Sequence, residues 1–437
     1  MAKVYPFRGL RYSPGKVSVE DVVTQPYDKI SREMQERYYA MHPQNIVRIV
    51  LGKAGPEDSE TNNVYTRAAA SMREWRQSGL LEPLKAPAFV VYFQKFTIPG
   101  TQEQRVRKGF IGLGQLEDYA NKVVFPHEKT LSGPKQDRLQ LLRHTRTHFE
   151  QIFMLYEDPE QRIDKALDEV AQGQPDIDVK DEYGVTHTLW IVDKSPVLEL
   201  IQKEMANKKL VIADGHHRYE TALAYRDEMR AAKGGGEADA AYERLSMTFF
   251  NMHSPGLTIL PTHRVVSRLK DFGSAELLEK AGQFFDTVDA PADAEPFRAE
   301  LKKSGEGRIT IGVCTDGGKK HALLRLKSSL DLASVMGDLT EKQRILDVVV
   351  LHRLLIEKCL GIMEEAVKKE SNITYVREFD AALKSVESGS AQVSFLLNAT
   401  RMDQMRDIAY EGNVMPQKST DFYPKVLSGL MMYSLDE

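Results

Sequence analysis

The stretch that decides the predicted fold reads Leu210-Val211-Ile212-Ala213-Asp214-Gly215-His216-His217-Arg218-Tyr219-Glu220-Thr221-Ala222. Its apolar start is typical of a buried strand, and the helical spacing of apolar residues from Ala222 onward indicates a helix. Gly215 permits the positive φ or the close approach that a tight turn requires. The first N–H groups of a helix lack intrahelical partners and lie at the positive end of its dipole, so they bind anions. The pattern predicts a strand, a turn and a helix N-terminus that binds phosphate or another anion.

The same turn also has a purely structural explanation, in which Asp214 caps the helix and the two histidines are ordinary surface groups. A cap needs only one polar side chain, whereas this turn brings together a carboxylate, two imidazoles and a guanidinium. We therefore favour a site composed of Asp214, Gly215, His216, His217 and Arg218.

Composition limits the class of protein. The 437 residues suggest about two to three domains of about 150 residues each. A hydrophobic content of 42% and a charged content of 28% are typical of globular proteins in water. The net charge of −4 argues against a binder of duplex nucleic acid. The predicted partner is therefore a small molecule, with no nucleic acid.

The cysteines and the apolar segments predict the compartment. Cys314 and Cys359 lie in apolar surroundings without metal-ligand spacing, which indicates core residues in a reducing compartment. The N-terminal residues do not resemble a signal peptide, and no apolar run approaches the roughly 18 residues of a membrane helix. We expect a cytoplasmic location and no membrane partner.

A second polar cluster begins with His127-Glu128-Lys129-Thr130 in a predicted loop, before a predicted helix over residues 135–149. Glu128 is the candidate general base, because a carboxylate beside cations can accept a hydroxyl proton during transfer. The neighbouring candidates for phosphate or substrate binding are His127, Lys129, Thr130, Lys135 and Arg138. Taken alone, a solvated loop before a capped helix explains the pattern equally well.

A third cluster lies near the C-terminus, in the segment Val414-Met415-Pro416-Gln417-Lys418-Ser419-Thr420-Asp421-Phe422-Tyr423-Pro424-Lys425. A lysine beside hydroxyl groups provides the point charge and the donors that a phosphate requires. Lys418, Ser419 and Thr420 are therefore candidate phosphate ligands. The alternative is a loop packed by Phe422 and Tyr423.

Local patterns predict several further elements. A short helix should begin at Ser31, an amphipathic helix should cover residues 61–80, and the β-branched residues of 45–51 predict a strand. A helix over residues 343–359 is apolar enough to belong to a core, so His352 is interpreted as structural.

Three widely separated segments resemble a family of bacterial and archaeal proteins, domain-of-unknown-function family 1015. They are Pro-Tyr-Asp at 26–28, the His-Glu-Lys-Thr loop with Pro-Lys-x-Asp-Arg, and Ala-Asp-Gly-His-His-Arg-Tyr-Glu-Thr-Ala. The ending Met-Pro-x-Lys-Ser-Thr-x-Phe-x-Pro-Lys agrees as well. The resemblance runs nearly from end to end of the chain, but the family name carries no activity.

The turn at residues 214–218 also resembles the signature turn of the ParB/sulfiredoxin-like superfamily. His216 occupies the position of the sulfiredoxin cysteine, which excludes thiol-based repair of sulfinic acids. Archaeal ADP-dependent free-serine kinases of that superfamily have a similar Asp-Gly-His turn and a glutamate base. This resemblance implies an α+β fold with a mixed-sheet, nucleotide-binding core and additional α/β regions. The predicted division is 1–100, an N-terminal α+β region; 101–268, the catalytic core; and 269–437, a C-terminal α+β domain whose last segment returns to the site.

The residues and the resemblance together predict an enzyme that transfers a phosphoryl group to or from free L-serine or O-phosphoserine. It would act as a serine kinase with ADP or ATP, or as a phosphoserine phosphatase. His217, Arg218 and the helix N-terminus would hold phosphates, with Lys418, Ser419 and Thr420 as a second clamp. Asp214 would help to hold Mg²⁺. His216 would be a general acid, or a phosphohistidine nucleophile in a phosphatase.

Two other classes of function stay open at this point. One is a non-catalytic nucleotide-binding regulatory protein of ParB type. The other is a nuclease-like relative of ParB, which requires a basic groove that the sequence does not indicate.

Overall fold

The computed structural model describes residues 1–129, 133–194, 196–368 and 371–436. The chain divides into two compact units. Unit 1 comprises Met1–Pro126, Thr130–Thr258 and Pro424–Glu437, and unit 2 comprises His127–Lys129 and Ile259–Tyr423. This division differs from the three predicted regions, because the N-terminal 100 residues share a unit with residues up to 258. The end of the chain returns to unit 1, where residues 424–435 are buried.

A mixed sheet forms the centre of unit 1, with nine strands among the described residues. Its order is β6 (Val124–Phe125), β11 (Leu210–Asp214), β8 (Ile152–Tyr156), β12 (Arg244–Asn251), β5 (Gln104–Gln115), β4 (Phe89–Thr97), β10 (Thr186–Val192) and β9 (Ile177–Lys180), and β1 (Val4–Tyr5) also pairs with β5. The pairs β11–β6 and β12–β8 are parallel and the others are antiparallel. The predicted α+β class with a mixed sheet is therefore confirmed.

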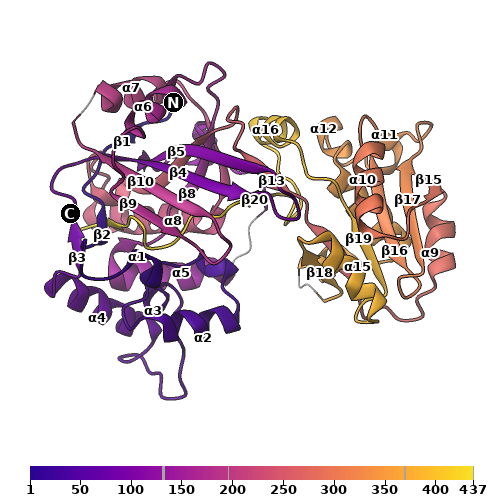
Figure 1. Cartoon of the computed structure of the whole chain (residues 1–437), viewed down its shortest axis with the longest axis horizontal. Helices are drawn as coiled ribbons and strands as arrows, with labels where there is room; N and C mark the ends of the chain where they lie inside the picture. Colours follow the sequence, from indigo (N-terminus) through magenta and orange to yellow (C-terminus); the bar gives the residue numbers. More distant parts are fainter. Residues whose placement is uncertain (130–132, 195, 369–370, 437) are drawn as a thin grey trace. The chain divides into compact units, whose positions relative to one another are not determined.

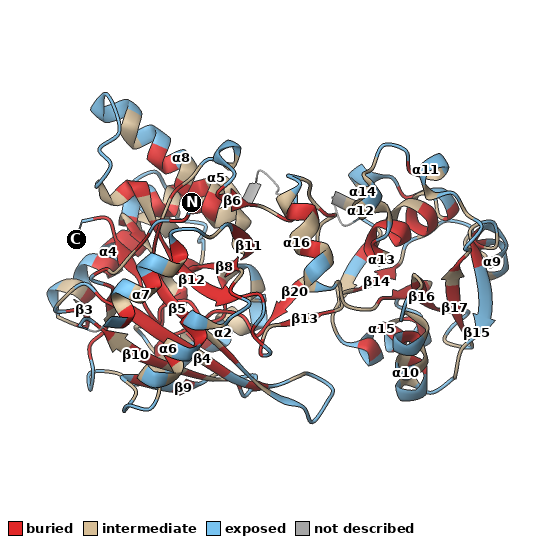
Figure 2. Ribbon diagram, turned by 90° about the horizontal axis from the view of Figure 1, so that it is seen from above, coloured by how far each residue is buried: buried red, intermediate tan, exposed pale blue. Residues whose placement is uncertain are grey.

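Helices cover this sheet because each carries an apolar face. In α6 (Arg162–Val170), Ile163 and Leu167 are one turn apart and both are buried in the core. The core also includes residues of α7 (Pro196–Met205) and α8 (His216–Lys233). Figure 1 shows α6 and α7 on one side of the sheet and α5 (Gly133–Thr145) and α8 on the other. The central strands β5, β8 and β12 are mostly buried, as their red colour in Figure 2 shows.

Unit 2 is built on an antiparallel sheet, with six strands among the described residues. Their order is β15 (Phe285–Asp289), β17 (Lys320–Leu326), β16 (Thr310–Thr315), β19 (Val393–Leu396), β14 (His263–Val266) and β18 (Ile373–Val376). Helices α10 (Ala294–Ser304) and α15 (Phe379–Glu387) pack their apolar residues against it. Cys314 lies in this core, and burial raises the pKa of its thiol to about 12. Both cysteines are buried, as predicted.

The local predictions are confirmed where the sequence contains a helix cap or a long stretch of helical apolar periodicity. Ser31 caps α2 (Arg32–Met41) by accepting a hydrogen bond from the Met34 N–H, and α4 (Val64–Gln77) covers most of the predicted helix. The strand predicted for residues 45–51 is wrong, because this segment contains the short helix α3 (Val47–Val50). The helix predicted for residues 343–359 is interrupted into α12 (Glu341–Arg344), α13 (Asp347–Val350) and a π-helix over Leu351–Cys359.

Among the residues that the structure describes, no helix has both the length and the apolar character needed to cross a bilayer.

The aromatic stack at the centre of the unit 1 sheet should dominate its stability. Phe110 is fully buried, with ring centroids 5.5 Å from Phe89 and 4.9 Å from Phe249. We expect Phe110→Ala to lower the free energy of unfolding by about 3–5 kcal/mol, because it leaves a cavity in the core. On the same strand Val106 is 37% exposed, and Val106→Ala should cost about 0.5 kcal/mol or less. Urea unfolding of the two variants checks this, and equal losses would contradict the assigned core.

Candidate functional site

The turn between β11 and α8 places Asp214 and Arg218 side by side. The register of β11 against β8 shifts between Ile212 and Asp214, so a bulge ends the strand at the turn. Gly215 follows with φ +93°. A Cβ atom there would lie 3.1 Å from both the Arg218 guanidinium and Ile152. Only glycine fits this position, and α8 begins directly after it as predicted.

Asp214 lies between two cations. Its Oδ2 accepts a hydrogen bond from Arg218 Nη2 at 2.8 Å, and its Oδ1 accepts one from Lys425 Nζ at 3.2 Å. Burial alone would raise the pKa of this carboxyl, but the positive charges of Lys425, Arg218 and Lys29 outweigh burial. They hold the pKa of Asp214 well below its ordinary value. Asp214 is therefore an ionised counter-charge at neutral pH.

Arg218 is also held by Gln151 and Glu150. Its Nη1 donates to the backbone oxygen of Gln151 at 2.7 Å, and its Nε lies 4.0 Å from Oε2 of Glu150. The other oxygen of Glu150 accepts from the Tyr27 N–H at 2.9 Å and from Ser428 Oγ at 2.7 Å. These contacts fix the guanidinium in one orientation before any ligand binds.

A small cavity adjoins this arginine. It has a volume of about 40 Å³, and its lining includes Arg138, Glu150, Arg218 and Thr221. A water molecule needs roughly 10–15 Å³ of such volume, so about three waters fit. The cavity is therefore too small for a whole nucleotide.

The segment that carries Lys425 is anchored by a buried arginine. Gln94 Nε2 donates to the Lys425 backbone oxygen at 2.8 Å, and Arg107 Nε donates to Gln94 Oε1 at 3.0 Å. Arg107 also donates to the backbone oxygen of Pro424. Its guanidinium lies 4.5 Å from the ring centroids of Phe153 and of Phe250. Lys425 is thus positioned by the core of the sheet.

Positive charge exceeds negative charge in this cluster. Burial lowers the pKa of Arg107 to about 9, which leaves it protonated at neutral pH. Arg107, Arg218 and Lys425 are buried or nearly so and carry three positive charges, against the two negative charges of Asp214 and Glu150. Lys29 and Asp28, whose charges also act on this cluster, add one charge of each sign, so the surplus is one positive charge. The surplus lies at the N-terminus of α8, which itself favours anions. The arrangement can therefore bind and neutralise an anion.

The other predicted residues of unit 1 have distinct surroundings. His216 and His217 are half-buried in the first turn of α8. Lys135 forms an ion pair with Glu220 of α8, so its charge is neutralised within the protein. Arg138 donates to the backbone oxygen of Val50 at 2.7 Å, with its guanidinium 4.0 Å from the ring centroid of Tyr27.

Unit 2 brings the second and third sequence clusters together. Glu128 Oε1 accepts a hydrogen bond from the Lys418 N–H at 3.0 Å. Lys418 has φ +56°, a left-handed conformation that is uncommon for residues other than glycine. The buried Arg264 donates to the backbone oxygens of Gln417 at 3.2 Å and Lys418 at 3.0 Å. Burial lowers the pKa of Arg264 to about 10, and the charge of Glu128 opposes this shift.

His352 supports the same arginine. Arg264 Nε lies 3.3 Å from His352 Nε2, and burial lowers the pKa of this imidazole to about 3. A neutral His352 accepts the hydrogen bond, in agreement with its predicted structural role.

The remaining predicted residues of unit 2 differ in exposure. His127 is fully buried, and its Nε2 lies 2.7 Å from Thr420 Oγ1. Ser419 is buried and donates to the backbone oxygen of Pro416. Lys129 is exposed and forms an ion pair of 3.2 Å with Glu364. Thr130 lies outside the described residues.

The predicted site residues thus fall into two groups, each within one unit. Sequence reasoning proposed no role for Lys425, Arg107 and Glu150 in unit 1 or for Arg264 in unit 2. Lys425 belongs to the third cluster, but it has no hydroxyl groups beside it, which were the signal that selected Lys418. Arg107 and Glu150 gave no local signal, because they act through contacts distant in sequence.

The contacts of Asp214 bear on the predicted Mg²⁺ site. Among residues 1–129, 133–194, 196–368 and 371–436, no group of three His, Cys, Asp or Glu side chains is arranged to hold a metal ion. Both carboxylate oxygens of Asp214 already face cations. The protein alone does not fit a resident Mg²⁺ ion here, so phosphate oxygens would have to supply most of its ligands.

Removing the Lys425 charge should raise the pKa of Asp214. A carboxylate with a depressed folded pKa adds stability above the unfolded value of about 4 and loses it as the pH falls. Lys425→Met should therefore move the Asp214 midpoint upward, measured by NMR titration of its carboxyl carbon. Lys85→Met, at an exposed lysine of the same unit, is the control and should leave the midpoint unchanged. An unchanged midpoint in Lys425→Met would contradict the assigned contact.

Comparisons with known proteins identify the family. Among solved structures, the chain is similar to a conserved hypothetical protein from Pyrococcus furiosus, with 11% identity and a TM-score of 0.35 over 72% of this chain and 93% of that chain. It is also similar to a free serine kinase in complex with AMP, with 12% identity and a TM-score of 0.36 over 70% of this chain and 89% of that chain. These low scores carry no functional conclusion. No curated protein matches the chain. A family model described as "Protein of unknown function (DUF1015)" matches residues 4–349, so the chain belongs to that family.

Proposed function

We propose that this protein is a phosphoryl-transfer enzyme that binds a phosphate group at the N-terminus of α8. The observation that supports it most is the surplus of positive charge around Asp214, where Arg218, Lys425 and Arg107 meet. Phosphoryl transfer demands mainly positioning and neutralisation of charge. Cations that are already fixed and desolvated supply both without reorganisation during the reaction.

Each residue of the site has a role in this proposal. Arg218 presents a planar fork of N–H donors that suits phosphate oxygens, and Lys425 acts as a point charge. The N–H groups of His216 and His217 add the donors of a helix N-terminus. Asp214 keeps the two cations apart and correctly oriented until the anion arrives.

The proposed substrate pair is free L-serine and O-phosphoserine, with ADP or ATP as the nucleotide. This choice rests on the resemblance of the Asp-Gly-His turn to the turn of free-serine kinases. In the kinase direction, the serine hydroxyl oxygen forms a bond to the terminal phosphorus of the nucleotide. The bond from that phosphorus to the bridging oxygen breaks, the shortened nucleotide leaves, and the hydroxyl proton passes to a base. In the reverse direction, ADP accepts the phosphoryl group of O-phosphoserine. In a phosphatase, water accepts that group in place of ADP.

Glu128 is the proposed base, and His216 is the proposed acid or, in a phosphatase, the nucleophile. A Mg²⁺ ion bound with the nucleotide would offset charge on the phosphate oxygens. In unit 2, Lys418 provides an ammonium and Thr420 a hydroxyl as a further phosphate clamp.

A non-catalytic nucleotide-binding regulatory role is the second candidate. It is favoured by the fact that the proposed base, Glu128, already accepts a hydrogen bond from the Lys418 N–H. A carboxylate held in this way is a weaker base.

Phosphorus NMR of the purified protein with Mg²⁺ and O-phosphoserine, with and without ADP, separates these functions. ATP that forms only with ADP establishes a reversible kinase, and free phosphate without nucleotide establishes a phosphatase. No change in either sample would contradict the proposed catalysis and favour the regulatory role.

Glu128→Gln should reduce turnover at least about 100-fold and leave nucleotide affinity nearly unchanged, because the amide cannot accept the proton but keeps an oxygen for the Lys418 N–H. Turnover is measured by phosphorus NMR and affinity by calorimetry. The control is Glu74→Gln at an exposed position of α4. Unchanged turnover, or an equal loss of turnover and affinity, would contradict the assignment of Glu128 as the base.

A further inference from the structure

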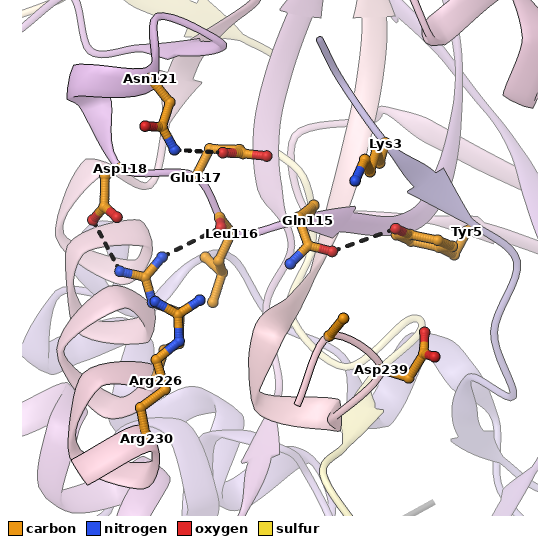
Figure 3. A pocket seen from close by; sticks show the side chains of 11 residues that line it. Lys3, Tyr5, Gln115, Leu116, Glu117, Asp118, Asn121, Arg226, Arg230 and Asp239 are labelled. Carbon is orange, nitrogen blue, oxygen red and sulfur yellow. Dashed lines mark hydrogen bonds and ion pairs between the residues drawn. The ribbon is translucent and has the colours of Figure 1, made fainter. Parts of the chain in front are cut away.

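Unit 1 contains a larger cavity that the proposed function does not use. Its volume is about 420 Å³, within the range of roughly 300–1,000 Å³ that is common for small-molecule sites. Figure 3 shows its lining, in which Lys3 and Tyr5 belong to the N-terminal segment and Arg226 and Arg230 project from α8.

The two arginines of this cavity are already neutralised. Arg226 is buried and donates to Asp118 at 2.9 Å and to Asp227 at 2.8 Å. Arg230 forms two hydrogen bonds with Glu243, of 2.7 and 2.6 Å. A guanidinium paired in this way has little attraction left for a polyanion. The cavity is therefore not a second site for nucleotide phosphates.

Two charges of opposite sign remain in the lining. Within the described part of the chain, the Lys3 ammonium and the Glu117 carboxylate form no ion pair with each other or with any other side chain. The carboxylate of Glu117 accepts a hydrogen bond from Asn121 Nδ2 at 2.8 Å. Figure 3 shows the Lys3 amine and the Glu117 carboxylate directed toward the same space, next to Gln115. The third carboxylate, that of Asp239, pairs with Arg244 at 2.6 Å.

We propose that this cavity binds a small zwitterion, a molecule with one ammonium group and one carboxylate. Its ammonium lies against Glu117 and its carboxylate against Lys3. The carboxylate of Glu117 would repel a purely anionic ligand, and the ammonium of Lys3 would repel a purely cationic one. Only a ligand that carries both charges satisfies both side chains.

The cavity is separate from the Asp214 cluster. Both involve α8, but Arg226 follows His216 by ten positions, which corresponds to about 15 Å along a helix. A zwitterion bound here leaves the anion site free, in a cavity lined in part by the same helix whose first turn forms that site. The ligand is accordingly an effector rather than a phosphoryl acceptor, and this inference does not depend on the proposed function.

Saturation-transfer NMR titrations of the full chain with glycine, β-alanine and 4-aminobutyrate test this inference. These probes carry the same two charges at increasing separation, and butyrate and butylamine carry one charge each. We expect one length to bind best and the singly charged probes to bind at least about tenfold more weakly. Lys3→Met and Glu117→Gln should each weaken that best probe about tenfold. Lys85→Met and Glu74→Gln are the matched controls, at exposed residues away from the cavity.

Three results would overturn the inference. One is no binding of any zwitterion, and another is binding that survives both Lys3→Met and Glu117→Gln. The third is butyrate binding as tightly as the zwitterions with dependence on Lys3 alone, which would indicate a simple anion site. Lys425→Met should leave zwitterion affinity unchanged, so failure here is distinguishable from failure of the proposed phosphate site.

Discussion

The Asp214 carboxylate between Arg218 and Lys425 is the interaction on which unit 1 depends. It joins the turn between β11 and α8 to the last segment of the chain, and these two parts are far apart in sequence. Removing one partner from a buried charge pair commonly costs about 3–5 kcal/mol, because the other charge is left without compensation. The contact therefore fixes the returning C-terminal segment as well as the charge at the site.

The C-terminal segment shows how the core serves this site. Arg107 lies against the rings of two neighbouring phenylalanines and donates to the backbone oxygen of Pro424, and Gln94 donates to that of the next residue, Lys425. Burying an arginine costs free energy unless its N–H donors form hydrogen bonds. Here the donors of Arg107 bind Gln94 and the backbone oxygen of Pro424, and these contacts position Lys425. The side chain of a lysine is flexible, so packing alone would not fix the position of its ammonium. The surplus positive charge thus depends on the return of the C-terminal segment to the sheet of unit 1.

The sequence predicted contiguous features well and distant contacts poorly. The turn at Gly215 could be predicted because strand, glycine and helix follow one another, and Ser31 could be predicted because a cap acts within one turn. The strand expected at residues 45–51 is a helix because tertiary contacts override β-branched propensity. Asn45 Oδ1 accepts the Val47 N–H at 2.9 Å, and Asn45 Nδ2 donates to the Asp21 backbone oxygen at 2.7 Å. Lys425, Arg107 and Glu150 share a site only after folding, so no window of sequence reveals them together.

The most direct test of the central claim is calorimetric titration of the intact protein with pyrophosphate, at one fixed ionic strength. If the surplus charge around Asp214 forms an anion site, the wild-type protein binds pyrophosphate. Lys425→Met then binds at least about tenfold more weakly, Lys425→Arg retains most of the affinity, and Lys85→Met equals the wild type. Equal affinity in the wild-type protein and Lys425→Met, with both folded by circular dichroism, would contradict the account.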